Sequence, residues 1–141
     1  MTDDEARRRF AEAKVARLAT VTNTGEPHLV PICFAIDGAT DTIFSAVDAK
    51  PKTTPDLKRL RNIEANPNVT LLVDHYEDDW TNVWWVRADG RATVNDPGTP
   101  EHGRALLVDK YAQYRQNPDA LGRIVVVQVQ KWTSWAYADL G

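Results

Sequence analysis

The side chains of this chain best suited to chemistry are five cations between residues 50 and 61. They are Lys50, Lys52, Lys58, Arg59 and Arg61. The whole chain has 17 basic and 20 acidic residues and a formal net charge of −3. A local basic cluster therefore indicates a local anionic ligand rather than a general polyanionic partner. The cluster runs from a Pro/Thr loop, KPKTTP, into a short predicted helix. Loop amides, helix N-terminal amides and fixed cations can together hold a phosphate or carboxylate group. A solvated basic helix face is the alternative.

Other residue types that carry chemistry are scattered along the chain. The three histidines, His28, His75 and His102, are far apart and show no metal-ligand spacing with cysteine or carboxylates. Cys33 lies in an apolar predicted strand, where a buried small hydrophobe is more common than a nucleophile. Hydride transfer from an organic cofactor needs mainly binding, orientation and electrostatics from the protein. The sequence therefore favours a cofactor site made of cations, backbone groups and aromatic walls, with no metal.

The chain contains five tryptophans, Trp80, Trp84, Trp85, Trp132 and Trp135. Because successive residues of a strand point to opposite faces, one of Trp84 and Trp85 would face the core and the other a helix or subunit interface. In a second interpretation, Trp80 and one of this pair form walls of a pocket for a planar ring. Both interpretations hold if the pocket lies at a dimer interface.

Length and composition indicate one folded domain covering residues 1–141. The chain is 43% hydrophobic and 26% charged, as is typical of a folded soluble protein. It has no run of about eighteen apolar residues, so no transmembrane helix is predicted. The N-terminus lacks the apolar core of a signal peptide. The single cysteine excludes an internal disulfide and fits a reducing, cytoplasmic environment.

Hydrophobic periodicity and turn residues predict the secondary structure. Six strands are predicted, at residues 15–22, 27–36, 42–47, 69–76, 82–95 and 123–137. Helices are predicted at residues 2–14, from residue 55 to about residue 64, and from about residue 100 to 115. Thr2 and Glu5 form a capping box, Asp56 is a candidate cap, and Thr99 is predicted to cap a helix that begins at Pro100.

Three residues mark irregularities in the predicted strands. Pro31 indicates an edge strand, a bulge or an interruption, because proline cannot donate a ladder hydrogen bond. Gly90 indicates a bulge or kink, and a second bulge is predicted near Lys131. Hairpin connections followed by long strands predict a mainly β fold, a six-stranded antiparallel barrel with peripheral helices.

Three segments of the sequence resemble a known family. They are LATVTNTGEPHLVPICFAID, KRLRNIEANPNVTLLVD and DWTNVWWVRADGRATV, in this order. They resemble the split β-barrel family that binds flavins and deazaflavins, which is the pyridoxamine-phosphate-oxidase-like superfamily. Within it, the chain is most similar to the actinobacterial branch of probable coenzyme F-420-dependent oxidoreductases. The resemblance covers residues 10 to 137 and implies an FMN-binding-like split barrel.

The resemblance also implies how a cofactor would be held. Members of the family are homodimers with two cofactors in grooves at the interface. By resemblance, Arg59 would hold the phosphate, with Lys58 and Arg61 as neighbours. Arg59 stands where the family commonly has lysine, and the loop from 48 to 55 is longer than usual. This loop carries Lys50, Lys52 and Thr53.

The ring of the cofactor has its own implied contacts. It would lie against residues 28–32, which include His28 and Pro31, and against residues 45–47, which begin with Ser45. Residues around Trp80 of the second subunit would close the pocket.

The first functional hypothesis is an F-420-dependent enzyme that transfers a hydride to an unsaturated or quinone-like small molecule. The deazaflavin coenzyme carries a phosphodiester and a polyglutamate tail, which five cations match better than the single phosphate of FMN. An FMN-dependent oxidase or reductase of the same fold is the second hypothesis. The others are a non-catalytic cofactor carrier, a single-stranded nucleic-acid binder that uses its tryptophans, and a haem protein with His28 or His75 as axial ligand. The net acidity argues against nucleic acid.

Overall fold

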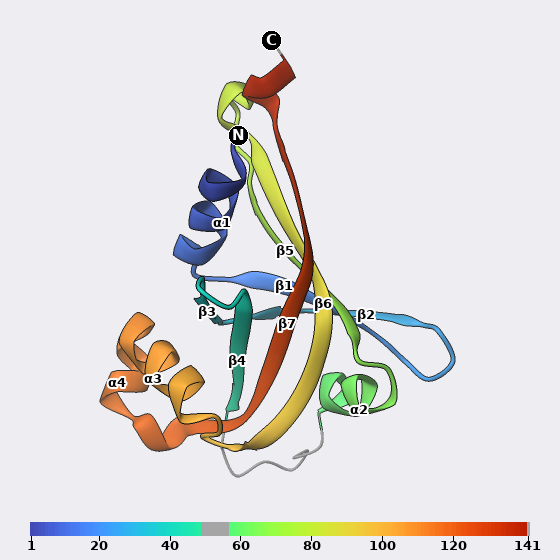
Figure 1. The fold of residues 1–141 in the computed structure, drawn as a ribbon, viewed down its shortest axis with the longest axis vertical. Helices are drawn as coiled ribbons and strands as arrows, with labels where there is room; N and C mark the ends of the chain where they lie inside the picture. Colours follow the sequence, from blue (N-terminus) through green and yellow to red (C-terminus); the bar gives the residue numbers. More distant parts are fainter. Residues whose placement is uncertain (49–56, 141) are drawn as a thin grey trace.

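The computed structural model describes residues 1–48 and 57–140, except for the side chain of residue 48. Its centre is an antiparallel sheet of seven strands in the order β2-β1-β5-β6-β7-β4-β3 (Figure 1). The strands are β1 Ala16–Val21, β2 Pro27–Ile32, β3 Ala35–Asp37, β4 Thr42–Asp48, β5 Asn68–His75, β6 Trp84–Pro97 and β7 Leu121–Ala136. The mainly β fold is thus confirmed.

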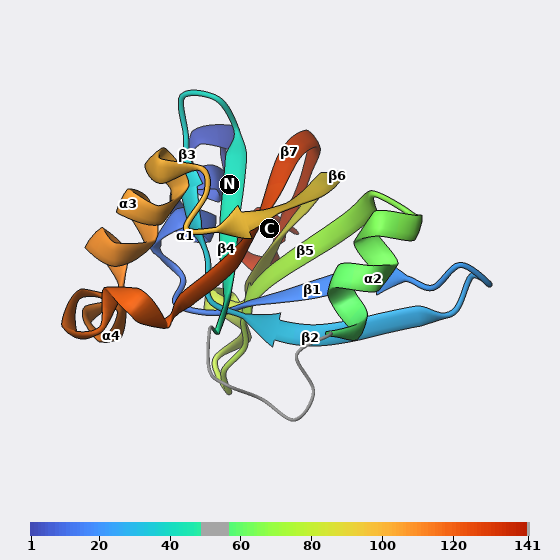
Figure 2. The same cartoon turned by 90° about the horizontal axis from the view of Figure 1, so that it is seen from below.

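Among residues 1–48 and 57–140, four α-helices and three short 3-10 helices accompany the sheet. They are α1 Asp3–Glu12, α2 Lys58–Ala65, α3 Glu101–Lys110, α4 Ala112–Gln116, η1 Trp80–Asn82, η2 Pro118–Ala120 and η3 Tyr137–Leu140. Figure 2 shows α1, α3 and α4 together on one side of the molecule, while α2 lies apart from them beside β1 and β5. Among the described residues, no helix is long and apolar enough to cross a membrane.

The strand count differs from the predicted six because the predicted strand 27–36 divides into β2 and β3. The break lies at Phe34, whose backbone N–H donates to the hydroxyl of Tyr111 and whose carbonyl accepts from it, both at 2.9 Å. After the break β3 pairs with β4, at the edge of the sheet opposite to β2. The order of strands therefore ends in two edges, and the described sheet is not a closed barrel.

The helix cap at Thr2 was predicted correctly, and the one at Thr99 was not. The Thr2 hydroxyl accepts a hydrogen bond from the Glu5 amide at 3.1 Å, which confirms the first half of the predicted capping box. The cap of α3 is Pro100, with an extended backbone and no capping side chain, so the prediction that Thr99 caps this helix was wrong. The helix also ends at Lys110, because Tyr111 is extended and a separate helix, α4, follows it.

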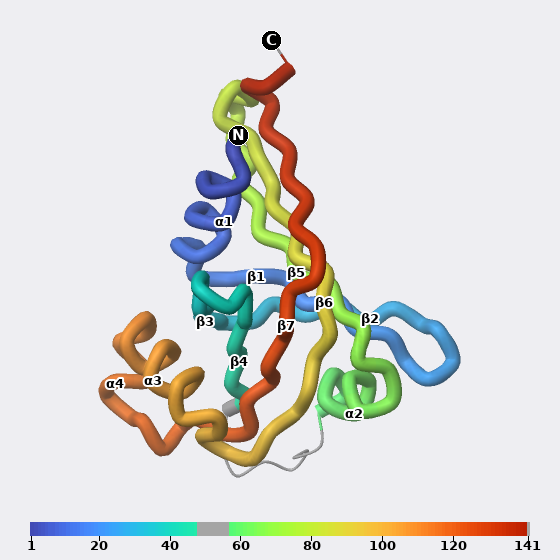
Figure 3. Tube along the Cα trace, viewed as in Figure 1, coloured from blue at the N-terminus to red at the C-terminus, as the bar shows by residue number. Residues whose placement is uncertain are grey.

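The predicted bulge is confirmed in the long strands β6 and β7, which curve through the height of the molecule (Figure 3). Asp89 pairs with Lys131, but the next residue, Gly90, pairs with Val129, so β7 has one extra residue at this point. A Cβ at Gly90 would lie 2.4 Å from the carbonyl oxygen of Gln128, so only glycine allows this close approach of the two strands.

The buried residues form two clusters on opposite sides of the sheet, because the consecutive β4 residues Ile43 and Phe44 belong to different clusters. Phe10 of α1 packs against Phe34, with ring centroids 5.0 Å apart, and against Trp132 at 5.1 Å. A second buried cluster lies under α3 and includes Phe44 and Leu107. These clusters fix α1 and α3 on the sheet.

The side of the sheet opposite to α1 and α2, in the part that α3 does not cover, is called the outer face below. Cross-strand partners share a face of a sheet, and the register of β2, β1, β5, β6 and β7 therefore defines its residues. They are Arg17, Ala19, Leu29, Pro31, Thr70, Leu72, Asp74, Trp85, Arg87, Thr133 and Trp135.

Candidate functional site

The first turn of α2 carries three of the five predicted cations. Lys58, Arg59 and Arg61 lie within its first four residues. The N-cap is Leu57, which offers no side chain to the helix amides, and no acidic residue occurs in the first turn. The positive end of the helix dipole therefore coincides with positive side chains, an arrangement that a bound anion would stabilise.

The helix is fixed to the sheet by residues that alternate with these cations. The side-chain amide of Asn62 donates to the hydroxyl of Thr20 at 3.0 Å, and both residues are buried, at 5% and 1% exposure. Leu60 and Ile63 belong to the main core. Lys58 and Arg61 are exposed and Arg59 is half-buried, so α2 presents part of its basic side to solvent from a rigid base.

The predicted start of this helix needs a correction. The structure begins α2 at Lys58 with Leu57 as the cap, rather than at residues 55 and 56. Asp56, the predicted cap, lies outside the described residues, as do Lys50, Lys52 and Thr53. The contribution of this loop to an anion-binding site therefore stays a prediction.

The two β2 residues predicted to contact the ring point to opposite faces of the sheet. His28 lies opposite Thr20 on the helix-facing side, whereas Pro31 lies opposite Arg17 on the outer face. β2 is an edge strand, as Pro31 predicted. The Nδ1 atom of His28 is buried, and it has no hydrogen-bond partner among the described residues. A buried polar atom of this kind normally forms a hydrogen bond with a ligand, a water or an ion.

Ser45 is less available than the sequence suggested. It is 5% exposed, and its hydroxyl donates to the carbonyl of Cys33 at 2.8 Å. This bond connects β4 to the segment between β2 and β3. The contribution of Ser45 to a ring site would therefore come from its backbone.

The short helix η1, which begins at Trp80, and α2 lie at opposite ends of the molecule's long axis (Figures 1 and 3). Trp80 is 65% exposed and packs edge-on against Tyr137 of η3, at 6.4 Å between centroids. Tyr137 makes a similar contact with Trp135 at 6.5 Å. One chain does not bring Trp80 to α2, so a site that contains both needs a second copy.

The alternation of Trp84 and Trp85 is as the sequence predicted. Trp84 packs against the main core, with the Arg9 guanidinium 5.2 Å from its ring and His75 stacked at 6.3 Å. Glu77 accepts from Asn82 at 2.8 Å and contacts His75 at 2.5 Å, and these hydrogen bonds lower the pKa of the Glu77 carboxyl. His75 thus contacts the ring of Trp84 and the carboxylate of Glu77 within the chain.

Trp85 lies instead on the outer face, in a groove of about 540 Å³ that the sequence analysis did not predict. Leu29, Leu72 and Tyr76 form its other apolar walls. Arg17 and Asp74 also line it and pair at 3.5 Å. The alternation of these strands contained the signal, since their outward residues are unusually apolar for a solvated face.

Among the described residues, no three His, Cys, Asp or Glu side chains gather in a way that could hold a metal ion. The chemistry available to the described residues is therefore that of cations, buried amide and hydroxyl groups, one unpaired imidazole nitrogen and aromatic rings.

Comparison with known proteins identifies the family. Residues 2–136 match the family described as pyridoxamine 5'-phosphate oxidase, and the chain belongs to this family. No curated protein sequence matches the chain.

Solved structures with the same fold have low sequence identity to the chain. The conserved hypothetical protein Rv2991 from Mycobacterium tuberculosis has a TM-score of 0.77 at 20% identity, over 100% of this chain and 88% of that one. An FAD-binding protein (mll6688) from Mesorhizobium loti has a TM-score of 0.70 at 18% identity, over 95% and 94%. HutZ, the haem storage protein from Vibrio cholerae, has a TM-score of 0.70 at 16% identity, over 95% and 93%. At these identities the similarity shows the fold alone.

Proposed function

We propose that this protein binds the deazaflavin coenzyme F-420 and transfers a hydride between it and an unsaturated or quinone-like small molecule in the cytoplasm. The observation that carries the proposal is the first turn of α2, where uncapped amides coincide with Lys58, Arg59 and Arg61. Membership of the pyridoxamine 5'-phosphate oxidase family supports a phosphorylated cofactor at this place.

The role of the protein in this proposal is binding and orientation. The bound cofactor would supply the hydride chemistry itself. Lys58, Arg59 and Arg61 would hold its anionic groups, and the planar fork of arginine can contact two phosphate oxygens at once. The unpaired Nδ1 of His28 and the free edge of β2 are groups to which a ring system could hydrogen-bond.

The choice of deazaflavin over FMN depends on charge. The phosphodiester and polyglutamate tail need more partners than one phosphate does, and the chain has five cations between residues 50 and 61. Each exposed pairing contributes only about 0.2–1 kcal/mol, so the preference arises from the network. FMN is the alternative cofactor, and the fold shared with an FAD-binding protein favours it as the second candidate.

The test is a titration of purified protein with F-420 and with FMN, followed by fluorescence at low salt, for wild type and two variants. We expect tighter binding of F-420, and a loss of about tenfold or more in Arg59→Ala, because charge-assisted hydrogen bonds contribute about 1.5–3 kcal/mol. Arg8→Ala is the matched control, since Arg8 is an exposed arginine on α1 that pairs with Glu12. It should bind as wild type does.

Other outcomes would redirect the proposal. Equal affinity of wild type and Arg59→Ala would leave the basic residues as a solvated helix face. Tighter binding of FMN would establish the flavin alternative, and a haem spectrum in the purified protein would point to haem. If F-420 binds, oxidation of the reduced coenzyme by quinones and conjugated enones tests the reaction, and no turnover would indicate a cofactor carrier.

A further inference from the structure

A second group of reactive side chains lies where α3 ends against α1 and β3, away from α2. Lys110 is the last residue of α3 and is half-buried. Its ammonium nitrogen lies 3.8 Å from the ring centroid of Phe34, which is fully buried. It donates one hydrogen bond, to the carbonyl of Ala11 in α1 at 3.1 Å. The amine is therefore held in place against an apolar wall.

A second ammonium group lies beside the first. Lys14 donates to the backbone carbonyl of Lys110 at 3.5 Å. Both ammonium nitrogens approach the ring of Tyr111, Lys110 at 5.4 Å and Lys14 at 5.6 Å from the centroid. No ion pair in the described part of the chain involves either lysine.

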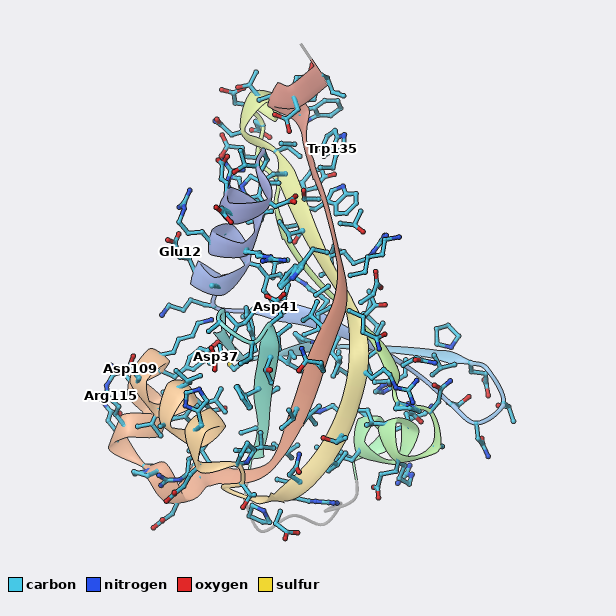
Figure 4. All side chains as sticks on the ribbon, viewed as in Figure 1. Glu12, Asp37, Asp41, Asp109, Arg115 and Trp135 are labelled. Atoms are coloured by element: carbon cyan, nitrogen blue, oxygen red, sulfur yellow. The ribbon has the colours of Figure 1, made fainter. Side chains whose placement is uncertain are left out.

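Nearby carboxylates on the packed helices are directed elsewhere. Glu12 of α1 pairs with Arg8 at 3.5 Å. Figure 4 shows Glu12 and Asp109 on the outward sides of α1 and α3. Asp37 of β3 contacts His102 at 2.9 Å. The positive charge of Lys110 thus has little compensation from acidic groups.

Burial and the charge of Lys14 favour the neutral amine, whereas the contact with the Phe34 ring and the hydrogen bond to Ala11 favour the charged form. Burial lowers the pKa of Lys110 to about 8, the charge of Lys14 lowers it too, and a thiolate at Cys33 would raise it. Tyr111 stays a neutral donor, since burial raises its pKa to about 12. At pH 7.4 a larger fraction of such an amine is unprotonated than of a lysine with the usual pKa.

We propose that Lys110 is a covalent modification site that reacts with small aldehydes through its ε-amine. A lysine that is desolvated and placed next to another cation is an activated nucleophile. The nitrogen attacks the carbonyl carbon and forms a C–N bond, while the carbonyl oxygen takes up a proton. Loss of water then gives the imine. Because Lys110 is half-buried, a small aldehyde is the class of reagent proposed.

The experiment is reductive alkylation of the full chain with a limiting amount of propionaldehyde and cyanoborohydride, with the sites resolved by peptide mass spectrometry. At pH 7.4 we expect Lys110 to react roughly tenfold faster than Lys131, an exposed lysine on β7. The ratio of the two rates should fall as the pH rises towards about 10, where an amine of ordinary pKa also becomes unprotonated.

Lys14→Met separates the electrostatic cause from simple accessibility. Removal of this neighbouring charge should slow labelling of Lys110 at pH 7.4 severalfold, although it uncovers the amine. Labelling of Lys131 should not change. Labelling of Lys110 at or below the rate of Lys131, or an unchanged or faster rate in Lys14→Met, would overturn the proposal. Neither result depends on whether α2 binds a cofactor.

Discussion

Adjacent residues of α2 have different tasks. Arg59 and Arg61 belong to the basic first turn, whereas Asn62 is buried and bonds to Thr20 of β1. In the sequence, Asn62 stands in the segment KRLRNIEANPNVTLLVD that carries the family resemblance. In the structure it is the polar contact that orients the helix, and the cations of the first turn depend on that orientation.

The Asn62–Thr20 bond should make a measurable contribution to stability. We expect Thr20→Val to lower the free energy of unfolding by about 1–3 kcal/mol, because it leaves the buried amide of Asn62 without its acceptor. Asn62→Ala should cost a similar amount. The double variant should cost less than the sum of the two, since both remove the same bond.

Urea denaturation of the four proteins measures this coupling. Asn23→Ala, in the exposed turn between β1 and β2, is the control and should change stability little. Strictly additive effects of Thr20→Val and Asn62→Ala would show that the bond is not a significant link between α2 and β1.

Lys110 and Tyr111 give the protein a pH-dependent stability. The pKa of Lys110 is lowered in the folded state, to about 8, so between pH 8 and about 10 the unfolded chain binds more protons. Stability should therefore rise with pH in this window. The pKa of Tyr111 is raised to about 12, so above pH 10 the folded chain binds more protons and stability should fall.

Chemical denaturation at pH 7, 8, 9 and 10 tests the contribution of Lys110. The rise should disappear in Lys110→Met, which keeps a long apolar side chain against Phe34. If the stability of Lys110→Met rose with pH by the same amount, another group would be its cause.

At the scale of elements, Gly103 sets how closely α3 approaches the sheet. A Cβ at this position would lie 2.3 Å from Cδ1 of Phe44 in β4. We expect Gly103→Ala to destabilise the protein by about 1–3 kcal/mol, as overpacking of a core does. Gly38→Ala is the control, because no atom lies within 4 Å of its Cβ position.

A second substitution examines the cause of that loss. Phe44→Leu in the Gly103→Ala background should cost less than Phe44→Leu in the wild type, since the smaller side chain makes room for the methyl group. Thermal or urea unfolding measures both. An additive double variant would mean that contact with Phe44 is not the source of the strain.

The sequence predicted most elements because their signals are local. The alternation of strands, the capping box at Thr2 and the bulge near Lys131 all depend on residues close in the chain. The two main failures were the break at Phe34 and the helix end at Tyr111. The two positions are in contact, since the Tyr111 hydroxyl bonds to Phe34 across 77 positions. No short sequence window contains both residues.

The candidate site was predictable to a similar degree. The basic turn of α2 follows from local charge and helix signals. The buried position of Ser45 and the opposite directions of His28 and Pro31 depend on how the strands pair and on which side the helices cover. The groove beside Trp85 combines residues of β1, β2, β5 and β6, so its shape arises only from the register of the folded sheet.

At the scale of the whole molecule, the two sides of the sheet are unequal. Helices α1 and α2 pack on one side through the main core, whereas α3 covers the other side only over β3, β4 and β7. The outer face carries the groove with Leu72 and Trp85, and Leu29 at its edge is 66% exposed. An apolar face of this kind is typical of a protein–protein interface.

We therefore expect the protein to be a homodimer that buries the outer face. Leu72→Arg should weaken the dimer at least tenfold, because it places a third cation beside Arg17 and Arg87 and would bury it without a partner. Sedimentation velocity at micromolar concentration measures the change, with circular dichroism as the check that the fold is retained. Ala112→Arg, at an exposed position of α4 that does not line the groove, is the matched control and should stay dimeric.

The same experiment bears on the cofactor site, because η1, which begins at Trp80, and α2 lie at opposite ends of one chain. A two-fold axis that lies in the interface, perpendicular to the long axis of the chain, would place η1 of one copy beside α2 of the other, so Leu72→Arg should also weaken cofactor binding although it changes no cation of α2. A monomeric wild type, unchanged by cofactor, would contradict the dimer. A Leu72→Arg monomer that binds cofactor as tightly as wild type would show that each chain has a complete site, and Trp80 would then have no part in it.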